Sequence, residues 1–160
     1  MTPPSKETLD EKINRLKEQF YLTDCAFDIE CIYQPGDLAG LLQGALSRLL
    51  PNNPVEIVEK LSADQQQYVA TVSSNDQPLL DLFADTHADF LPDNFPSLFE
   101  SLPERLGTEK RFYLLHPMLT GQVVWYFCGR PDELEQARSA GLPLMLPGED
   151  LYSQDVSEYL

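Results

Sequence analysis

Apolar residues recur at helical spacing near the start of the chain. The positions concerned are Leu9, Ile13, Leu16 and Phe20. Their spacing predicts an amphipathic helix over about 6–21. Thr8 followed three residues later by Glu11 fits a capping box at its beginning.

A second apolar stripe predicts a second helix over 37–50. Seven residues share one face of it: Leu38, Leu41, Leu42, Ala45, Leu46, Leu49 and Leu50. Asp37 is the expected N-cap and Pro51 the expected stop. Gly40 and Gly44 lower helix propensity, so we expect another segment to pack closely against them.

Alternation of apolar and polar residues predicts the strands. Between 26 and 34 it predicts a strand whose buried face carries Phe27, Ile29, Cys31 and Tyr33. Three further short strands at 55–61, 67–73 and 79–85 are separated by turn-type sequence at 62–64 and 74–78. This order predicts an antiparallel meander.

The last third of the chain predicts shorter elements. Prolines restrict 89–107 to short helical pieces near 96–106. Strands follow at about 110–116 and 122–128, then a helix from Pro131 to about 140 with Gly141 after its end, and a last strand within 142–146.

Together these elements predict a single α+β domain over 1–160, with polar tails at about 1–5 and 148–160. We expect a mostly antiparallel or mixed sheet of about five or six strands, with the two main helices packed on one face. A length of 160 residues with 42% hydrophobic composition suits one core and is too short for a (β/α)8 barrel.

The most aromatic stretch, 112–129, contains one of the two histidines and one of the three cysteines. A hairpin with a loop at 117–120 would pair His116 with Gly121, Phe112 with Trp125 and Leu114 with Val123. Cys128 would then lie roughly 20 Å or more from His116 at about 3.4 Å per residue, too far for a catalytic pair. We therefore interpret the stretch as core, with His116 solvated at the hairpin mouth.

The formal net charge of −15 is concentrated in the middle of the chain. No Lys or Arg occurs from Leu61 to Glu104, whereas eight acidic residues do. Such a surface repels phosphates, so direct nucleic-acid binding is disfavoured. No apolar run approaches the roughly 20 residues that span a bilayer, and three cysteines at no metal-type spacing favour free thiols. These features predict a cytoplasmic protein without membrane contact.

The leading functional hypothesis is a non-enzymatic binding protein whose acidic surface docks a basic protein, as an inhibitor or immunity-like protein or a chaperone-like protein would. The expected contact residues are Asp76, Asp81, Asp85, Asp89 and Asp93, with Phe90 and Phe95 as apolar anchors. The excess acid is also compatible with a merely solvating surface. No phosphate loop, nucleophile elbow, HExxH or EF-hand pattern occurs, so no cofactor is expected.

Two alternatives remain open. Asp85, His87 and Asp89 form a DTHAD segment that resembles metal-ligand segments of amidohydrolase-like and dipeptidase-like barrels. The resemblance implies a small metal-dependent hydrolase, although such enzymes draw further ligands from a much longer chain. The other alternative is a subunit or assembly factor of a larger complex, with the leucine-rich helix or the sheet face around Trp125 as its interface. The sequence predicts no oligomeric state.

Overall fold

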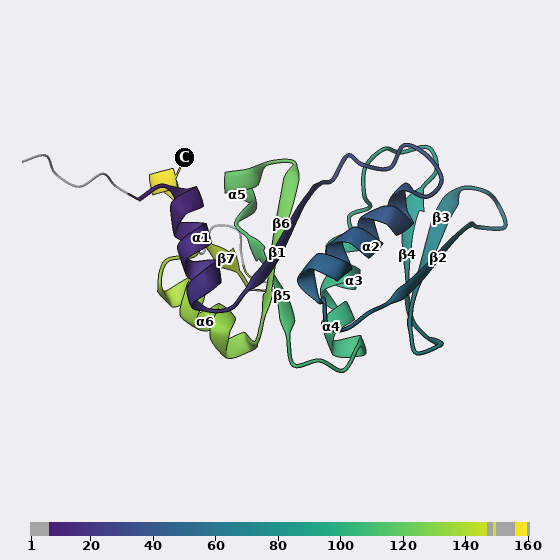
Figure 1. The fold of residues 1–160 in the computed structure, drawn as a ribbon. Coiled ribbons are helices and arrows are strands. Elements are labelled where there is room, and N and C mark those ends of the chain that lie inside the picture. Colours follow the sequence, from purple (N-terminus) through teal and green to yellow (C-terminus); the bar gives the residue numbers. More distant parts are fainter. Residues whose placement is uncertain (1–6, 147–148, 150–155, 160) are drawn as a thin grey trace, which may run out of the picture.

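A computed structural model describes residues 7–146, 149 and 156–159. Its helices and sheets lie in four alternating layers (Figure 1). One outer layer holds α1 (Leu9–Gln19) and α6 (Pro131–Ser139). The inner helical layer holds α2 (Asp37–Leu49), α3 (Phe95–Glu100) and α4 (Leu102–Arg105). No helix in this part of the chain is long and apolar enough to cross a membrane.

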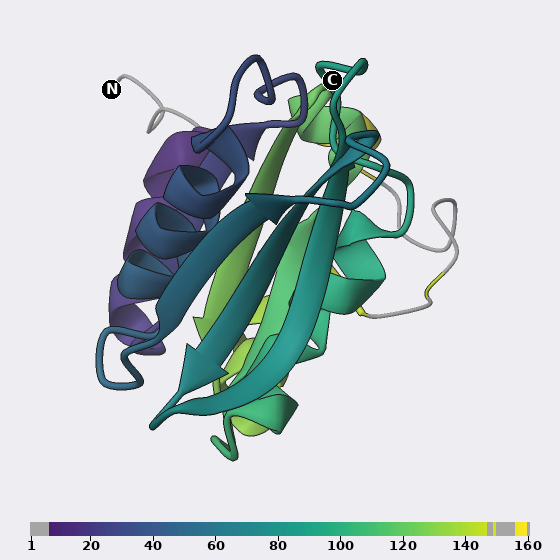
Figure 2. The ribbon, with the colours of Figure 1, turned by 90° about the vertical axis from the view of Figure 1, so that its right-hand side faces the viewer.

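The strands form two antiparallel sheets. The first has the order β1-β6-β5-β7, with β1 at Thr23–Asp28, β5 at Arg111–Leu115, β6 at Val123–Gly129 and β7 at Leu144–Met145. The second is a meander of β2 (Glu56–Leu61), β3 (Gln67–Ser74) and β4 (Gln77–Asp85). Figure 2 looks onto this meander, whose outer face no described element covers. The fold class and the meander are confirmed.

The prediction of one sheet with both main helices on one face was wrong. Alternate residues of the four-stranded sheet face two separate cores. Tyr126 packs with α2 and the meander, whereas Phe127 packs with Ile13 and Leu16 of α1. The two helices therefore cover opposite faces of this sheet (Figure 1). Neighbouring side chains on a strand point to opposite faces, so a strand with both faces apolar needs a layer on each side.

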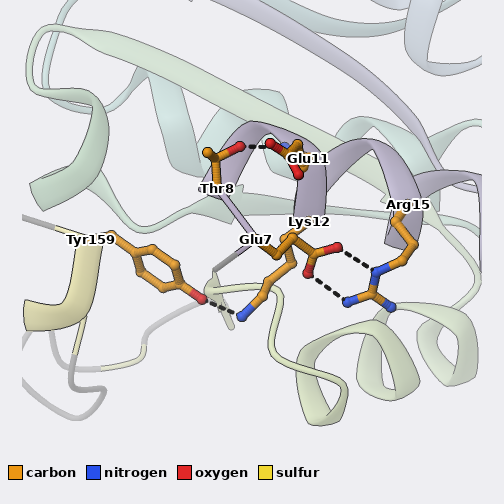
Figure 3. Close-up of polar contacts among 6 residues, drawn as sticks. All are labelled: Glu7, Thr8, Glu11, Lys12, Arg15 and Tyr159. Carbon is orange, nitrogen blue, oxygen red and sulfur yellow. Dashed lines mark hydrogen bonds and ion pairs between the residues drawn. The ribbon is translucent and has the colours of Figure 1, made fainter. Parts of the chain in front are cut away.

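Helix α1 begins as its capping residue predicts, because the Thr8 hydroxyl accepts a hydrogen bond from Glu11 N at 3.2 Å. The end of the chain returns to this helix (Figure 3). Lys12 Nζ donates to Tyr159 Oη at 2.5 Å, and Val156 is buried. The described part of the expected polar tail, including the 3-10 turn η1 (Ser157–Tyr159), therefore packs against the domain. Residues 1–5 lie outside the described residues.

Helix α2 is confirmed, but its N-terminus is stabilised differently from the prediction. Gly36, not Asp37, is the N-cap. The Glu59 carboxylate of β2 accepts hydrogen bonds from Gly36 N at 2.6 Å and Ala39 N at 2.9 Å, placing a negative charge at the helix start. Gly40 and Gly44 are exposed and nothing lies within 4 Å of a Cβ placed on either, so the expected close packing is absent there.

The strand predicted over 26–34 begins earlier and ends sooner. β1 starts at Thr23 and stops at Asp28, where the Asp28 carboxylate accepts a hydrogen bond from Glu30 N at 2.8 Å. Such a local side-chain to backbone bond competes with sheet pairing and turns the chain. Tyr33, expected to be buried, is 63% exposed.

The β5–β6 hairpin forms with a register three residues away from the expected one. Phe112 pairs with Cys128 and Leu114 with Tyr126. The loop between the two strands forms a helical turn, α5 (Pro117–Thr120), whereas a tight hairpin loop was expected. His116 is fully buried at the start of α5, where its Nδ1 accepts from Met118 N at 3.2 Å, so the prediction of a solvated His116 was wrong.

Candidate functional site

Two loops that are far apart in sequence pair at one end of the molecule. Leu91 N donates to Ile29 O at 2.8 Å, and Cys31 N donates to Asp89 O at 2.9 Å. Glu30 and Phe90 form an isolated antiparallel bridge between these bonds. The loop after β1 is thereby held against the loop after β4, and both run between the two sheets along the upper edge of Figure 1.

This pairing gathers five carboxylates at the same end. They are Asp28, Glu30, Asp85, Asp89 and Asp93, and we call them the acidic end. The three stretches that build this region, 18–47, 61–104 and 112–129, contain no Lys or Arg. Within residues 7–146 no ion pair involves any of the five. Their negative charge is therefore not neutralised by a cation of the described chain.

Hydrogen bonds fix part of the acidic end. Gln122 Nε2 donates to Asp28 Oδ1 at 2.7 Å and lies 3.2 Å from Glu30 Oε2. The Gln122 bond, and then the bond from Glu30 N, hold the pKa of Asp28 below its usual value. Asp85 accepts from His87 N at 2.7 Å. Asp28 and Asp85 thus present charges in fixed positions.

The Tyr33 side chain lies near carboxylates of both loops. Partial desolvation raises the pKa of the Tyr33 phenol, and the neighbouring charges of Glu30, Asp89 and Asp28 raise it further. One exposed phenol therefore senses carboxylates from both loops. Tyr33 and Phe90, which is 46% exposed, place aromatic rings beside the carboxylates.

Two cavities open beside the acidic end, and Pro92 lines both. The first, of about 240 Å³, is lined by apolar side chains of β6, α3 and both loops, with Asp93 among them. Its apolar walls include Ile29, Leu91, Phe95, Val124 and Tyr126. The second, of about 280 Å³, lies at the end of the meander and includes Phe83, Asp85 and Asn94.

The five aspartates predicted from the sequence do not form one patch. Asp85, Asp89 and Asp93 belong to the acidic end, but Asp76 lies in the β3–β4 turn at the other end of β4. Asp85 follows Asp76 by nine positions along an extended strand, a span of about 30 Å. Asp81 lies midway, where it accepts from the Thr71 hydroxyl at 2.7 Å. The expected single surface is thus split along β4.

The two predicted apolar anchors, Phe90 and Phe95, differ in their exposure to solvent. Phe90 is exposed, as a contact residue must be. Phe95 is only 2% exposed and stacks on Phe99 with ring centroids 5.4 Å apart. It therefore serves as a cavity wall and is not available as a protruding anchor.

The three residues of the metal alternative, Asp85, His87 and Asp89, are all exposed. Asp85 uses its carboxylate to accept the His87 backbone N–H, and the His87 side chain is exposed. Among the described residues, no group of three or more His, Cys, Asp or Glu side chains could hold a metal ion.

The thiols have the properties of structural cysteines. Burial raises the pKa of Cys128 to about 11, and burial with the charges of Asp28 and Asp37 raises that of Cys31 to about 11. Little thiolate exists at neutral pH under these conditions, so neither is an activated nucleophile.

One partly buried carboxyl group lies against the aromatic core. Glu100 ends α3, and Tyr126 Oη donates to its Oε2 at 3.5 Å. Burial raises the pKa of Glu100 to about 7, and the bond from Tyr126 opposes the shift. Burial and the nearby Glu100 also raise the pKa of the Tyr126 phenol, which remains a donor.

Sequence reasoning missed Asp28, Glu30, Tyr33 and the cavity. The alternation over 26–34 placed the first two on the solvated face of a strand and gave them no role. The signal that was present is the absence of cations from 18–47, which matches the absence from 61–104. No protein-family model, curated protein or solved structure matches this chain.

Proposed function

We propose that this protein is a non-enzymatic binding protein that docks a basic protein partner through its acidic end. The observation that carries the proposal is the pairing of two cation-free loops, which places Asp28, Glu30 and Asp89 around one exposed tyrosine. Like charges held together without neutralisation destabilise the free protein slightly and attract a cationic surface.

The physical advantage of such an arrangement is fast and oriented association. Complementary potentials steer the encounter, and they exclude acidic partners by repulsion. The same field repels nucleic-acid phosphates. Inhibitors or immunity-like proteins and chaperones for basic proteins are the classes that this chemistry fits.

The test compares two triple variants that remove equal charge. Glu30→Gln, Asp89→Asn and Asp93→Asn neutralise the acidic end. Glu56→Gln, Asp76→Asn and Glu104→Gln neutralise three exposed carboxylates outside it. Binding of fluorescent oligolysine and of cytochrome c, a folded basic protein, is measured by anisotropy at low and high salt.

We expect the first variant to bind both probes about tenfold more weakly, since each exposed charge contributes roughly 0.2–1 kcal/mol, and the second to bind like the wild type. Affinity should fall with added salt in every case. Equal weakening by both variants would mean that only net charge matters, and the proposal would then be rejected.

A further inference from the structure

The 240 Å³ cavity has the construction of a receptor for one apolar side chain. Its volume lies below the roughly 300–1,000 Å³ of sites for small-molecule ligands. Ile29, Leu91 and Val124 supply aliphatic walls, and Phe95 and Tyr126 supply aromatic ones. A single leucine-sized or phenylalanine-sized group is the scale of occupant that such a space admits.

The aromatic walls are formed before any ligand arrives. Phe95 is 2% and Tyr126 1% exposed. Phe95 stacks on Phe99 and meets the Phe27 ring edge-on at a centroid distance of 6.1 Å. Because these rings are held by the core, an entering group does not have to order them, and preorganisation of this kind favours binding.

The charges around the cavity decide the occupant. Asp93 is exposed and lines the cavity, and Pro92 connects it to the second cavity, which Asp85 lines. A second copy of this chain would bring its own acidic end and its net charge of −15 to a self-complementary contact. A basic segment is instead attracted on both sides of an inserted apolar residue.

We infer that this cavity receives one large apolar side chain of the basic partner, with lysine or arginine residues on either side of it contacting the acidic end. The inference rests on the proposed function and adds the partner's recognition element to it. Charge then supplies steering, and the buried side chain supplies the central contact that holds the complex.

The experiment uses two short peptides of alternating lysine and glycine, one with a central alanine and one with a central phenylalanine. Wild type is compared with Val124→Phe, which fills the cavity, and with Val123→Phe. Val123 is the adjacent residue on the opposite face of β6 and is 37% exposed. The two variants add the same group to the same strand.

We expect wild type and Val123→Phe to bind the phenylalanine peptide about tenfold or more tightly than the alanine peptide, since burying such a side chain contributes about 1.5–3 kcal/mol. Val124→Phe should lose this gain and keep its affinity for the alanine peptide. In parallel, the methyl resonances of Ile29 and Leu91 in the wild type should shift with the phenylalanine peptide only, a readout that does not depend on the folding of any variant.

Equal affinity of the two peptides for wild type, or unchanged methyl resonances, would overturn the inference while leaving charge-driven docking intact. A gain that survives in a folded Val124→Phe would also overturn it. Failure of both peptides to bind through the acidic end would instead reject the proposed function.

Discussion

The carboxyl group of Glu100 should make the stability of this protein fall as the pH rises above about 4.5. Burial raises its pKa in the folded protein from 4.5 to about 7. The folded state therefore binds the proton more tightly than the unfolded state does. The resulting stabilisation is complete below about pH 4.5 and is lost progressively as the pH rises through about 7.

The size of this stabilisation follows from the raised pKa of Glu100. Each pKa unit corresponds to about 1.4 kcal/mol. Because Glu100 remains partly exposed, solvent screening reduces this contribution to the free energy of unfolding to roughly 2 kcal/mol. Glu100→Gln removes the charge and keeps an acceptor for Tyr126 Oη. At pH 8 the free energy of unfolding of the variant should be about 2 kcal/mol higher than that of the wild type. At pH 4, where Glu100 is protonated in the wild type, this difference should be absent.

Urea denaturation followed through the single Trp125 measures this difference at several pH values. Glu104→Gln is the matched control, since Glu104 is an exposed carboxylate in the next helix, α4. The control should differ little from wild type at any pH. A difference between Glu100→Gln and wild type that is the same at pH 4 and pH 8, or that favours wild type at pH 8, would refute the reasoning.

Three further outcomes are expected. Gly40→Ala and Gly44→Ala should each raise the free energy of unfolding by about 0.5–1 kcal/mol, because α2 has open space at both positions; unchanged or lowered urea midpoints would contradict this. Glu59→Ala should lower it by about 1–2 kcal/mol by removing both bonds to the start of α2, and a neutral effect would dismiss that role. Cys128 should resist iodoacetamide at pH 8 until urea unfolds the protein, whereas rapid alkylation of the folded protein would contradict its raised pKa.

Local signals in the sequence predicted most of the individual elements. Thr8 begins α1 through its hydroxyl, and Pro131 begins α6 as expected. The β3–β4 turn follows from Asn75 and Asp76, which both adopt positive φ as a type I′ hairpin turn requires. In each case the residues that determine the structure lie within one turn or one strand of it.

The assembly of these elements could not be predicted in the same way. β1 pairs with β6, and Cys25 lies opposite Tyr126 across about a hundred residues of chain. No local pattern states which strands share a sheet, so one sheet was expected where two form. The β5–β6 register differs from the expected one because the loop between the strands forms the helical turn α5, so other strand positions lie opposite one another.

The candidate site could also be predicted only in part from the sequence. Its charge was visible in the sequence as the absence of Lys and Arg from 61–104. The identity of the carboxylates that meet depends on the bonds between Ile29 and Leu91 and between Cys31 and Asp89, which join two loops. The Asp28 side chain ends β1 and creates the first of these loops.

Cationic partners should bind at the acidic end. An NMR titration of the ¹⁵N-labelled protein with the phenylalanine-containing lysine peptide tests it most directly. The largest amide shift changes should fall within 28–33, 85–96 and 122–126, and they should shrink when salt is added. Changes of equal size around Glu56, Asp76 and Glu104, or changes scattered over the whole surface, would contradict the account.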